Sequence, residues 1–164
     1  LEAIDEAKVK AAIIQTFNPK NPWPEGGLEM IAGLNGKGGL LRMVRRAGVD
    51  KPLILATLLD IPSIGLACKT VQLVKERLGL PSGVAPLGVV EEWVKSGRGL
   101  KLTCRGATLA YVQASGVNFI IYGSIGKAPT VFPTVAMVDA ITAYTMRKYG
   151  VKPLTRKHPL YMIF

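Results

Sequence analysis

Short apolar runs alternate with longer stretches of helical periodicity along most of this chain. Three of the runs are almost continuously apolar and cover residues 11–17, 53–58 and 118–122. Runs of this length are typical of strands that are buried on both faces of a parallel sheet. A weaker strand is predicted within residues 82–85, between two prolines. The pattern therefore predicts four strands separated by helical segments.

Helices are predicted over residues 3–10, 40–47, 66–78, 89–95, 106–114 and 133–149, and a loop rich in proline and glycine over residues 18–39. Four of the helical stretches end in a glycine followed by an aliphatic residue, at Gly48, Gly79, Gly116 and Gly150. Glycine just past a helix adopts the left-handed turn that ends it at little steric cost. The glycines are 31, 37 and 34 residues apart, close to the length of one strand-plus-helix unit.

Consecutive βα units predict an α/β fold with a parallel sheet and right-handed crossovers. Two architectures fit, namely an open doubly wound sheet and half of a TIM-type (β/α)8 barrel. A whole barrel needs about 250 residues. We favour the carboxyl-terminal half, in which residues 1–164 form a single domain that carries strands five to eight with their helices. The leading helix has no strand before it, so we expect the upstream half of the barrel to be absent.

Composition narrows the class of protein. Apolar residues make up 49% of the chain and charged residues 20%, as in a globular domain. No run of about 18 apolar residues is present, so no transmembrane segment is predicted. Cys68 and Cys104 fall on separate predicted helices and form no CxxC pair. We therefore expect two buried thiols in a reducing cytoplasm, and no metal site.

The net charge of +10 raises the question of an anionic partner. The basic residues are spread along the chain, and many fall in last helical turns, where they complement the helix dipole. No RNA- or DNA-binding motif accompanies them. We expect a solvated basic surface or the docking of an acidic protein, and no nucleic acid.

In either architecture a site lies at the carboxyl ends of the strands. The residues expected there are Asn18, Thr57, Asp60, Ser82, Tyr122, Gly123 and Ser124. The single histidine, His158, lies in the tail, so a Ser-His-Asp triad is not supported. The glycines of residues 33–39 lack both a preceding strand and the GxxxxGK[ST] pattern of a phosphate loop, and we expect a flexible loop there. The polar, mostly uncharged set suits a heterocycle held by an amide-like edge.

Three stretches of the chain resemble the family formed by the H subunits of tetrahydromethanopterin S-methyltransferase. They are residues 14–19 (IQTFNP), residues 51–54 with 79–83 (KPLI and GLPSG), and residues 119–125 through 132–139 (FIIYGSI and FPTVAMVD). The third is the most specific, because it spans a strand, its loop and the next helix. The resemblance covers most of this chain but only the carboxyl-terminal half of the family's length.

The resemblance implies a dihydropteroate-synthase-like barrel and a methyltransferase of one-carbon metabolism and methanogenesis. The methyl group would move between methyl-tetrahydromethanopterin or methyl-tetrahydrofolate and a corrinoid (cobalamin) on a partner protein. Asn18 is the expected catalytic contact near N5 of the pterin. Asp60, Ser82, Tyr122 and Ser124 are the expected substrate-binding residues. Asn18 is also a good turn residue, and Asp60 also suits a helix cap.

Two other functions stay open. The chain could be a non-catalytic subunit or scaffold that docks a corrinoid protein or a membrane complex, or a barrel enzyme for phosphorylated substrates. Bare strand edges predict a homodimer or a multi-subunit assembly, which includes peripheral association with a membrane complex. We expect this length of chain to be inactive alone, because the upstream strands would carry other pterin contacts.

Overall fold

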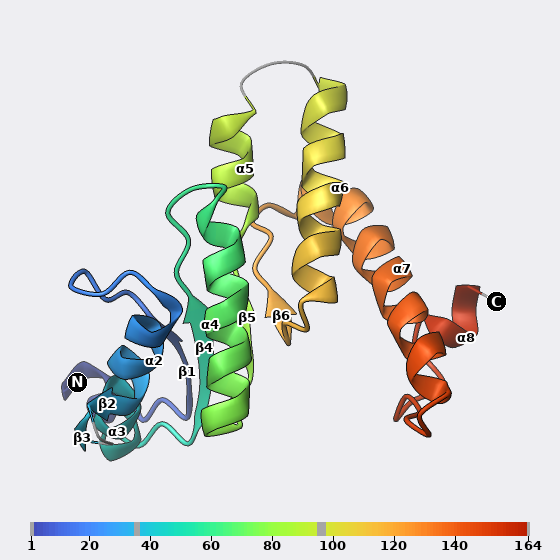
Figure 1. The fold of residues 1–164 in the computed structure, drawn as a ribbon. Helices are drawn as coiled ribbons and strands as arrows, with labels where there is room; N and C mark the ends of the chain where they lie inside the picture. Colours follow the sequence, from blue (N-terminus) through green and yellow to red (C-terminus); the bar gives the residue numbers. More distant parts are fainter. Residues whose placement is uncertain (1, 35–36, 95–97, 164) are drawn as a thin grey trace. The chain divides into compact units, whose positions relative to one another are not determined.

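The computed structural model describes residues 2–34, 37–94 and 98–163 (Figure 1). The chain divides into two compact units. The first comprises Leu1–Ala85 with Val117–Ile121, and the second comprises Pro86–Gly116 with Tyr122–Phe164. That the whole length forms one domain stays a prediction from the sequence.

The first unit is built on a parallel sheet of β1 (Ala11–Gln15), β4 (Lys51–Ala56), β5 (Ser82–Val84) and β6 (Phe119–Ile120), in that order. The register pairs Ile14 with Ile54, and Leu55 with Gly83. The strands cross the sheet in the order in which they occur in the chain, whereas a doubly wound sheet reverses its order at a switch point. The predicted α/β class and parallel βα units are therefore confirmed.

The strand boundaries differ from the predicted ones at several points. β1 ends at Gln15 rather than residue 17, β4 at Ala56 rather than residue 58, and β5 at Val84 rather than residue 85. β4 begins at Lys51 rather than Leu53, because Lys51 and Pro52 pair in register with the start of β1. β6 is limited to Phe119–Ile120 rather than residues 118–122, because only two residues of β5 pair with it. The ends of these strands are set by their neighbours and not by their own apolar length.

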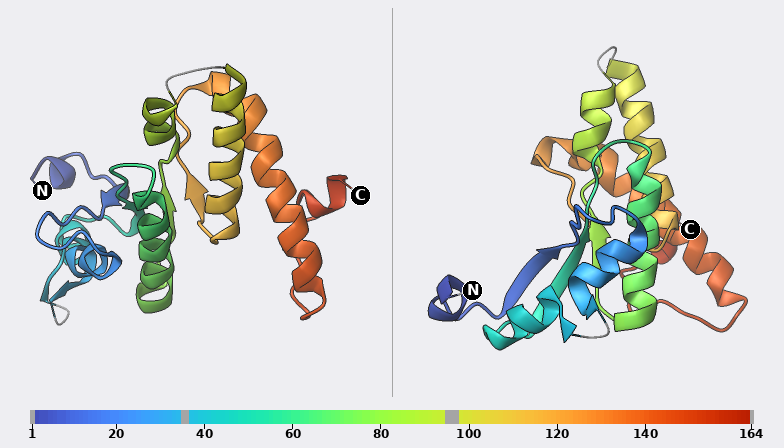
Figure 2. Two further views of the ribbon diagram at one scale, coloured as in Figure 1. Left: turned by 45° about the horizontal axis from the view of Figure 1, so that its top comes forward. Right: turned by 60° about the vertical axis from the view of Figure 1, so that its left-hand side comes forward.

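The helices of the first unit are α1 (Glu2–Glu6), α2 (Pro24–Ala32), α3 (Leu40–Arg46) and α4 (Ser63–Leu78). α4 runs alongside the strands of the sheet, and α2 packs against α4 (Figure 2). The core between the sheet and these helices contains Ile14, Ile31, Val44, Val49, Ile54 and Val74. α1 is shorter than predicted and ends at Glu6 instead of residue 10, before Lys8 adopts a positive φ of 49°.

α2 occupies part of the segment predicted as a loop, so that prediction is wrong for residues 24–32. Pro24 starts the helix, where its missing N–H is not needed. The glycines of residues 33–39 were predicted to form a flexible loop. Within the described residues they form a short antiparallel pair, β2 (Gly33–Leu34) with β3 (Lys37–Gly38), while Asn35 and Gly36 lie outside the described residues.

The second unit consists of α5 (Leu87–Trp93), α6 (Arg98–Ala114), the 3₁₀ turn η1 (Ile125–Lys127), α7 (Ala128–Arg147) and α8 (Leu160–Ile163). α6 packs along α7, as Figures 1 and 2 both show, and it also contacts α5. Gln113 of α6 donates a hydrogen bond to Asp139 of α7 at 2.6 Å. The tail packs back onto α7 through α8, with Leu160 buried.

Two helices of this unit are longer than the sequence predicts. α7 starts at Ala128, so Pro129 takes its first turn and Pro133 lies in its interior rather than in its first turn. Pro133 has no N–H to offer the carbonyl four residues before it. α6 starts at Arg98 instead of residue 106 and includes Gly99. The glycines at positions 97 and 99 predict an interruption between two helices. This prediction is wrong for Arg98 and Gly99, which belong to α6, while residue 97 lies outside the described residues.

All four predicted helix-ending glycines have a positive φ. The values are 84° at Gly48, 64° at Gly79, 80° at Gly116 and 80° at Gly150. At Gly79 the backbone N–H closes the last turn of α4 by donating to the carbonyl of Lys75. The cysteines lie on α4 and α6 as predicted. Cys68 is buried, while Cys104 is only half-buried, so the prediction of two buried thiols is correct for Cys68 alone.

Candidate functional site

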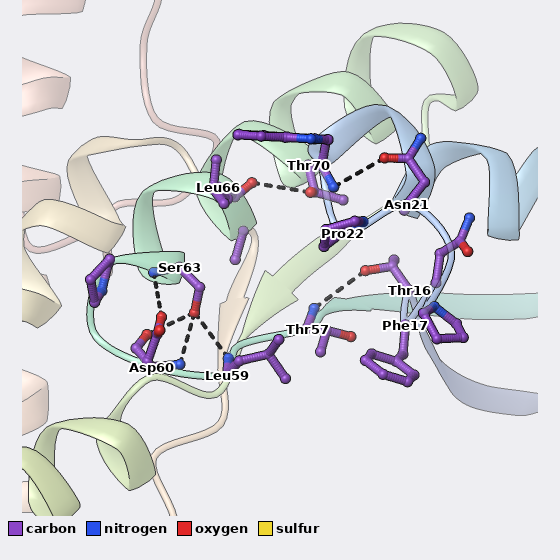
Figure 3. Close-up of a pocket in the computed structure, with 16 residues that line it drawn as sticks. Thr16, Phe17, Asn21, Pro22, Thr57, Leu59, Asp60, Ser63, Leu66 and Thr70 are labelled. Atoms are coloured by element: carbon purple, nitrogen blue, oxygen red, sulfur yellow. Dashed lines mark hydrogen bonds between the residues drawn. The ribbon is translucent and has the colours of Figure 1, made fainter.

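A pocket of about 460 Å³ opens at the carboxyl ends of β1 and β4 in the first unit (Figure 3). Its walls come from the segment that follows β1, the segment that follows β4, and the first two turns of α4. This is the edge of a parallel sheet at which ligands bind in α/β proteins. The pocket size also falls within the range of about 300–1,000 Å³ that is usual for small-molecule sites.

Glycines allow α2 to approach the pocket closely. A Cβ at Gly27 would lie 2.9 Å from Cγ2 of Thr70 and 3.3 Å from Oγ1 of Thr16. A Cβ at Gly26 would collide with the backbone of Asn21. α2 can therefore rest against both β1 and α4 only because these two helical positions carry no side chain. The close contacts of Gly26 with Asn21 and of Gly27 with Thr16 also hold the segment of residues 16–23 over the pocket.

Asn18 lies on the pocket wall and is half-buried. Its side-chain Nδ2 donates to the carbonyl of Gly26 at 3.1 Å, and its Oδ1 accepts from the backbone N–H of Lys20 at 3.1 Å. The amide thus ties the segment after β1 to α2, in keeping with the turn role left open by the sequence. An amide NH₂ has two N–H groups, so one donor of Asn18 is left for another acceptor.

Asp60 lies on the same pocket, at the corner shown with Ser63 in Figure 3. Its Oδ1 accepts from the Ser63 N–H at 2.9 Å, which caps the first turn of α4. The Ser63 hydroxyl accepts from the N–H groups of Leu59 and Asp60, at 2.9 and 3.0 Å, and donates to the carbonyl of Asp60 at 2.7 Å. The cap role that the sequence left open is therefore present. It uses one carboxylate oxygen and leaves the second available as an acceptor.

Ser82 does not lie where the sequence predicts it. It is the first residue of β5, so it sits at the amino end of the strand rather than the carboxyl end. Its side chain is completely buried, and its hydroxyl donates to the carbonyl of Leu80 at 3.0 Å. The Ser82 backbone N–H donates to the side chain of Asn118 at 3.1 Å. The bond to Asn118 joins the starts of β5 and β6, and Ser82 is not part of the pocket at the ends of β1 and β4.

Tyr122 and Ser124 belong to the second unit. The Tyr122 ring meets Phe132 of α7 edge to face, with centroids 5.7 Å apart and planes at 77°. Ser124 is exposed, and its carbonyl accepts from the N–H of Lys127 in η1. Of the five predicted site residues, the structure thus brings Asn18 and Asp60 to one pocket. It places Ser82 elsewhere and the other two in the second unit.

Several pocket residues were not singled out from the sequence. Thr16 and Thr70 line the pocket, as do Phe17, Trp23 and Leu66. Phe17 and Trp23 are 48% and 63% exposed. Thr16 could have been found, because it follows β1 in the way that Thr57 follows β4. Thr70 could not, since only the packing of α2 and α4 brings it to the pocket.

The ionic cluster of the second unit joins three elements. Oε1 of Glu91 on α5 accepts from Nη2 of Arg105 on α6 at 2.7 Å, and from Nζ of Lys127 on η1 at 2.9 Å. The hydrogen bond from Lys127 lowers the pKa of the Glu91 carboxyl below its ordinary value of 4.5, and the charge of Arg105 acts in the same direction. Partial burial opposes this lowering of the pKa without overcoming it. Glu91 therefore stays ionised to a lower pH than a free glutamate.

Metal ligands and membrane-spanning helices would each point to a different class of site. Among the described residues, no three His, Cys, Asp or Glu side chains gather as metal ligands would. In the same part of the chain, none of the helices combines the length and the apolar character needed to cross a bilayer. His158 lies in the tail, as predicted, where its Nδ1 accepts from the N–H of Leu160 at 3.2 Å.

The fold and the pocket define an α/β protein of the class that carries its ligand site at the carboxyl ends of parallel strands. The chain belongs to the family described as tetrahydromethanopterin S-methyltransferase MtrH subunit, whose family model matches residues 1–154. The predicted family resemblance is thereby confirmed.

Curated relatives agree with this assignment. The chain is 32% identical to the H subunit of tetrahydromethanopterin S-methyltransferase from Methanopyrus kandleri, over 97% of this chain and 55% of the relative. It is 30% identical to the H subunits from Methanocaldococcus jannaschii and Methanothermobacter thermautotrophicus, over 96% and 99% of this chain and 55% of each relative. The chain therefore spans about half the length of the curated relatives it matches.

Proposed function

We propose that this chain is the carboxyl-terminal half of a (β/α)8 barrel that moves a methyl group between a methyl-tetrahydropterin and a corrinoid protein. The observation that carries the proposal is the pocket at the ends of β1 and β4, with Asn18 and Asp60 on its wall. Family membership and the sequential strand order support it. The names of the relatives favour methyl-tetrahydromethanopterin as the pterin, and methyl-tetrahydrofolate has the same reacting bicycle.

The pocket suits a flat, polar-edged bicycle. Phe17 and Trp23 offer aromatic faces at its rim, and Leu59 and Leu66 add apolar surface. Aromatic side chains stack on planar rings, while the threonine, asparagine and aspartate side chains of the wall can pair with ring nitrogens and the amino group. An apolar pocket with a few convergent polar groups is the usual form of such a site.

Asn18 is assigned the catalytic contact. The methyl group leaves N5 more readily when N5 receives a hydrogen bond or a proton as the N–CH₃ bond breaks. The N–H of Asn18 that is not bonded to Gly26 can donate in this way. The bonded N–H holds the amide in place, which reduces the reorganisation needed for reaction. The docked corrinoid supplies the cobalt nucleophile that accepts the methyl group.

Asp60 is assigned to the pterin amino group, which would donate to the carboxylate oxygen that does not cap α4. Tyr122 and Ser124 are assigned to the ring or tail of the substrate, as the family resemblance implies. Ser82 has no such place in the proposal, because its hydroxyl is buried and donates to Leu80.

The assembly proposed around this chain is a multi-subunit complex, in keeping with the subunit names of its relatives. The second unit holds ten Lys and Arg against three Asp and Glu, so +7 of the net +10 lies there. A basic surface of this kind complements an acidic corrinoid protein. Since strands one to four of the barrel would carry further pterin contacts, the 164-residue chain alone should not transfer methyl groups.

The first prediction tests the catalytic assignment in the assembled complex, isolated from its host by a tag on this chain. Asn18→Ala should lower methyl transfer from methyl-tetrahydromethanopterin to cob(I)alamin by about a hundredfold, since a hydrogen-bond donor at the leaving nitrogen is lost. The partner proteins should still co-purify at wild-type yield. Asn118→Ala is the matched control, because this amide joins β5 to β6 and should leave the rate within about threefold.

A second candidate function is a non-catalytic subunit that docks the corrinoid protein or a membrane complex. The structural bonds of Asn18 and Asp60 favour it, because both side chains already serve the fold. Full methyl transfer by the Asn18→Ala complex would establish this alternative and refute the catalytic assignment. Loss of both transfer and partner proteins would show instead that Asn18 is needed for folding.

A further inference from the structure

Three threonines line the pocket, and their hydroxyl groups are in different situations. Oγ1 of Thr16 accepts from the backbone N–H of Thr57 at 3.3 Å. Oγ1 of Thr70 donates to the carbonyl of Leu66, one turn earlier in α4, at 3.0 Å. The hydroxyl of Thr57 is buried and has no hydrogen-bond partner among the residues that the structure describes. Thr57 is therefore the pocket threonine whose polar atom the fold does not use.

A buried hydroxyl without a partner is uncommon in proteins, because it gives up its bonds to water and gains nothing in return. Each such group calls for an explanation, such as a catalytic role or a water or ion that occupies the site. Thr57 directly follows β4 and belongs to the pocket wall, beside Thr16 and Phe17 in Figure 3. Its position is thus at the strand end where the substrate is proposed to lie.

The hydroxyl of Thr57 is covered, although the residue as a whole is only half-buried and lines the pocket. A threonine exchanges the places of its hydroxyl and methyl groups by rotation about one bond, χ1. The backbone N–H of Thr57 is held by Thr16, whereas its hydroxyl makes no bond to the described residues. A rotation can therefore present the hydroxyl to the pocket without breaking a hydrogen bond of this part of the chain.

We infer that Thr57 is a substrate-binding residue whose hydroxyl turns from the pocket wall toward the polar edge of the bound bicycle. The inference rests on the proposed function and deepens it. A hydroxyl both donates and accepts, so it can pair with an amide-like carbonyl or with a ring nitrogen. The bound substrate supplies a hydrogen-bond partner for the Thr57 hydroxyl, whereas the described residues of the pocket wall supply none. Because this bond forms only in the rotamer that faces the pocket, substrate binding favours that rotamer.

The test uses the full 164-residue chain with threonine-selective methyl labelling, titrated by NMR with methyl-tetrahydromethanopterin and, separately, with 5-methyl-tetrahydrofolate. Thr57→Val keeps the shape of the side chain and removes the hydroxyl. It should melt at the wild-type temperature or higher, because an unpaired buried group is lost, and it should bind the pterin about tenfold more weakly. In the wild-type chain the χ1-dependent coupling of Thr57 should change on saturation.

Two further variants control the result. Thr57→Ser retains the hydroxyl and should bind within about threefold of wild type. Thr134→Val removes a half-buried hydroxyl of α7 that is bonded to the carbonyl of Thr130 and does not line the pocket, so it should lower the melting temperature and leave binding within about twofold. A stability gain together with a binding loss is therefore expected for Thr57→Val and not for Thr134→Val.

A Thr57→Val chain that melts earlier and binds as wild type does would overturn the assignment, because the hydroxyl would then serve the fold. An unchanged Thr57 coupling at saturation would also overturn it. If the wild-type chain binds neither pterin, the proposed function fails and takes the assignment with it. That outcome can be told apart from a failure of the Thr57 assignment alone, because neither the wild type nor any variant would then show changes in the threonine methyl signals.

Discussion

At the scale of single residues, the pocket depends on two positions that carry no side chain as much as on the side chains that line it. Gly26 and Gly27 bring α2 against Asn21, Thr16 and Thr70, and the amide of Asn18 holds the preceding segment to Gly26. The same few contacts shape the pocket and orient its proposed catalytic group. A substitution that restores a side chain here should therefore damage the site and the fold together.

Gly27→Ala is the corresponding prediction. The new methyl group would lie 2.9 Å from Cγ2 of Thr70, so α2 or α4 must shift. We expect a loss of about 1–3 kcal/mol in the free energy of unfolding, the usual effect of overpacking. Gly106→Ala is the matched control, since no atom lies within 4 Å of its Cβ position in α6. It should stabilise the chain by up to about 1 kcal/mol through helix propensity. Urea unfolding of both variants measures the difference, and equal effects would contradict the close-packing argument.

At the scale of elements, the second unit is joined by a carboxylate shared between two cations. Glu91 of α5 binds Arg105 of α6 and Lys127 of η1. Because the pKa of Glu91 is lowered in the folded chain, its ionised form stabilises the fold above the ordinary pKa of 4.5. This stabilisation is lost as the pH falls from that value through the lowered pKa of the folded state.

Glu91→Gln should therefore lower the melting temperature at pH 7, and this deficit should shrink as the pH falls below 4.5 and the wild-type carboxylate becomes protonated. The comparison is Glu92→Gln, which removes the exposed neighbouring carboxylate and no salt bridge seen among the described residues. Thermal unfolding of the wild type and of both variants across this pH range measures the difference in melting temperature. The ion cluster would be refuted as a stabilising device if the two variants followed the same pH profile.

The elements also show which features are predictable from sequence. The strands and the four helix-ending glycines were predicted because apolar runs and left-handed turns are local signals. α2 was missed because tertiary packing, rather than propensity, favours a helix with glycine at positions 26 and 27. Ser82 was misplaced because the register with β4, which pairs it with Ile54, decides where β5 begins. Asn18 and Asp60 were predicted as strand-end residues, while Thr70 reaches the pocket through packing alone.

At the scale of the whole molecule, the chain has about half the length of its relatives and leaves apolar surface exposed. On α7 the exposed apolar side chains include Phe132, Met137, Ile141 and Tyr144, each at least 49% accessible. β1 and β6 are the outer strands of the sheet, so among the described residues each has one edge that no other strand pairs with. Exposed edges and apolar helix faces favour association with another chain.

We therefore expect the chain to sediment as a dimer or larger species rather than at its monomer mass of 17.6 kDa. Ile141→Lys should shift this equilibrium toward monomer, because it places a charge on the apolar face of α7. Thr142→Lys, at the next exposed position of the same helix, should have little effect. Analytical ultracentrifugation measures the mass of the wild type and of both variants. At about 100 µM even a weak contact with a millimolar dissociation constant would begin to show. A wild-type chain that is monomeric at this concentration would contradict the expected association.

The central claim is that a methyl-tetrahydropterin binds in the pocket at the ends of β1 and β4. The chain has two tryptophans, Trp23 on the pocket and Trp93 in the second unit, so each can be removed as a control for the other. The most direct measurement is fluorescence during titration with methyl-tetrahydromethanopterin. We predict saturable quenching in Trp93→Phe with a dissociation constant at or above about 1 mM for the chain alone, and none in Trp23→Phe. Equal quenching in both variants, or tight binding of the pterin to the chain alone, would contradict the account.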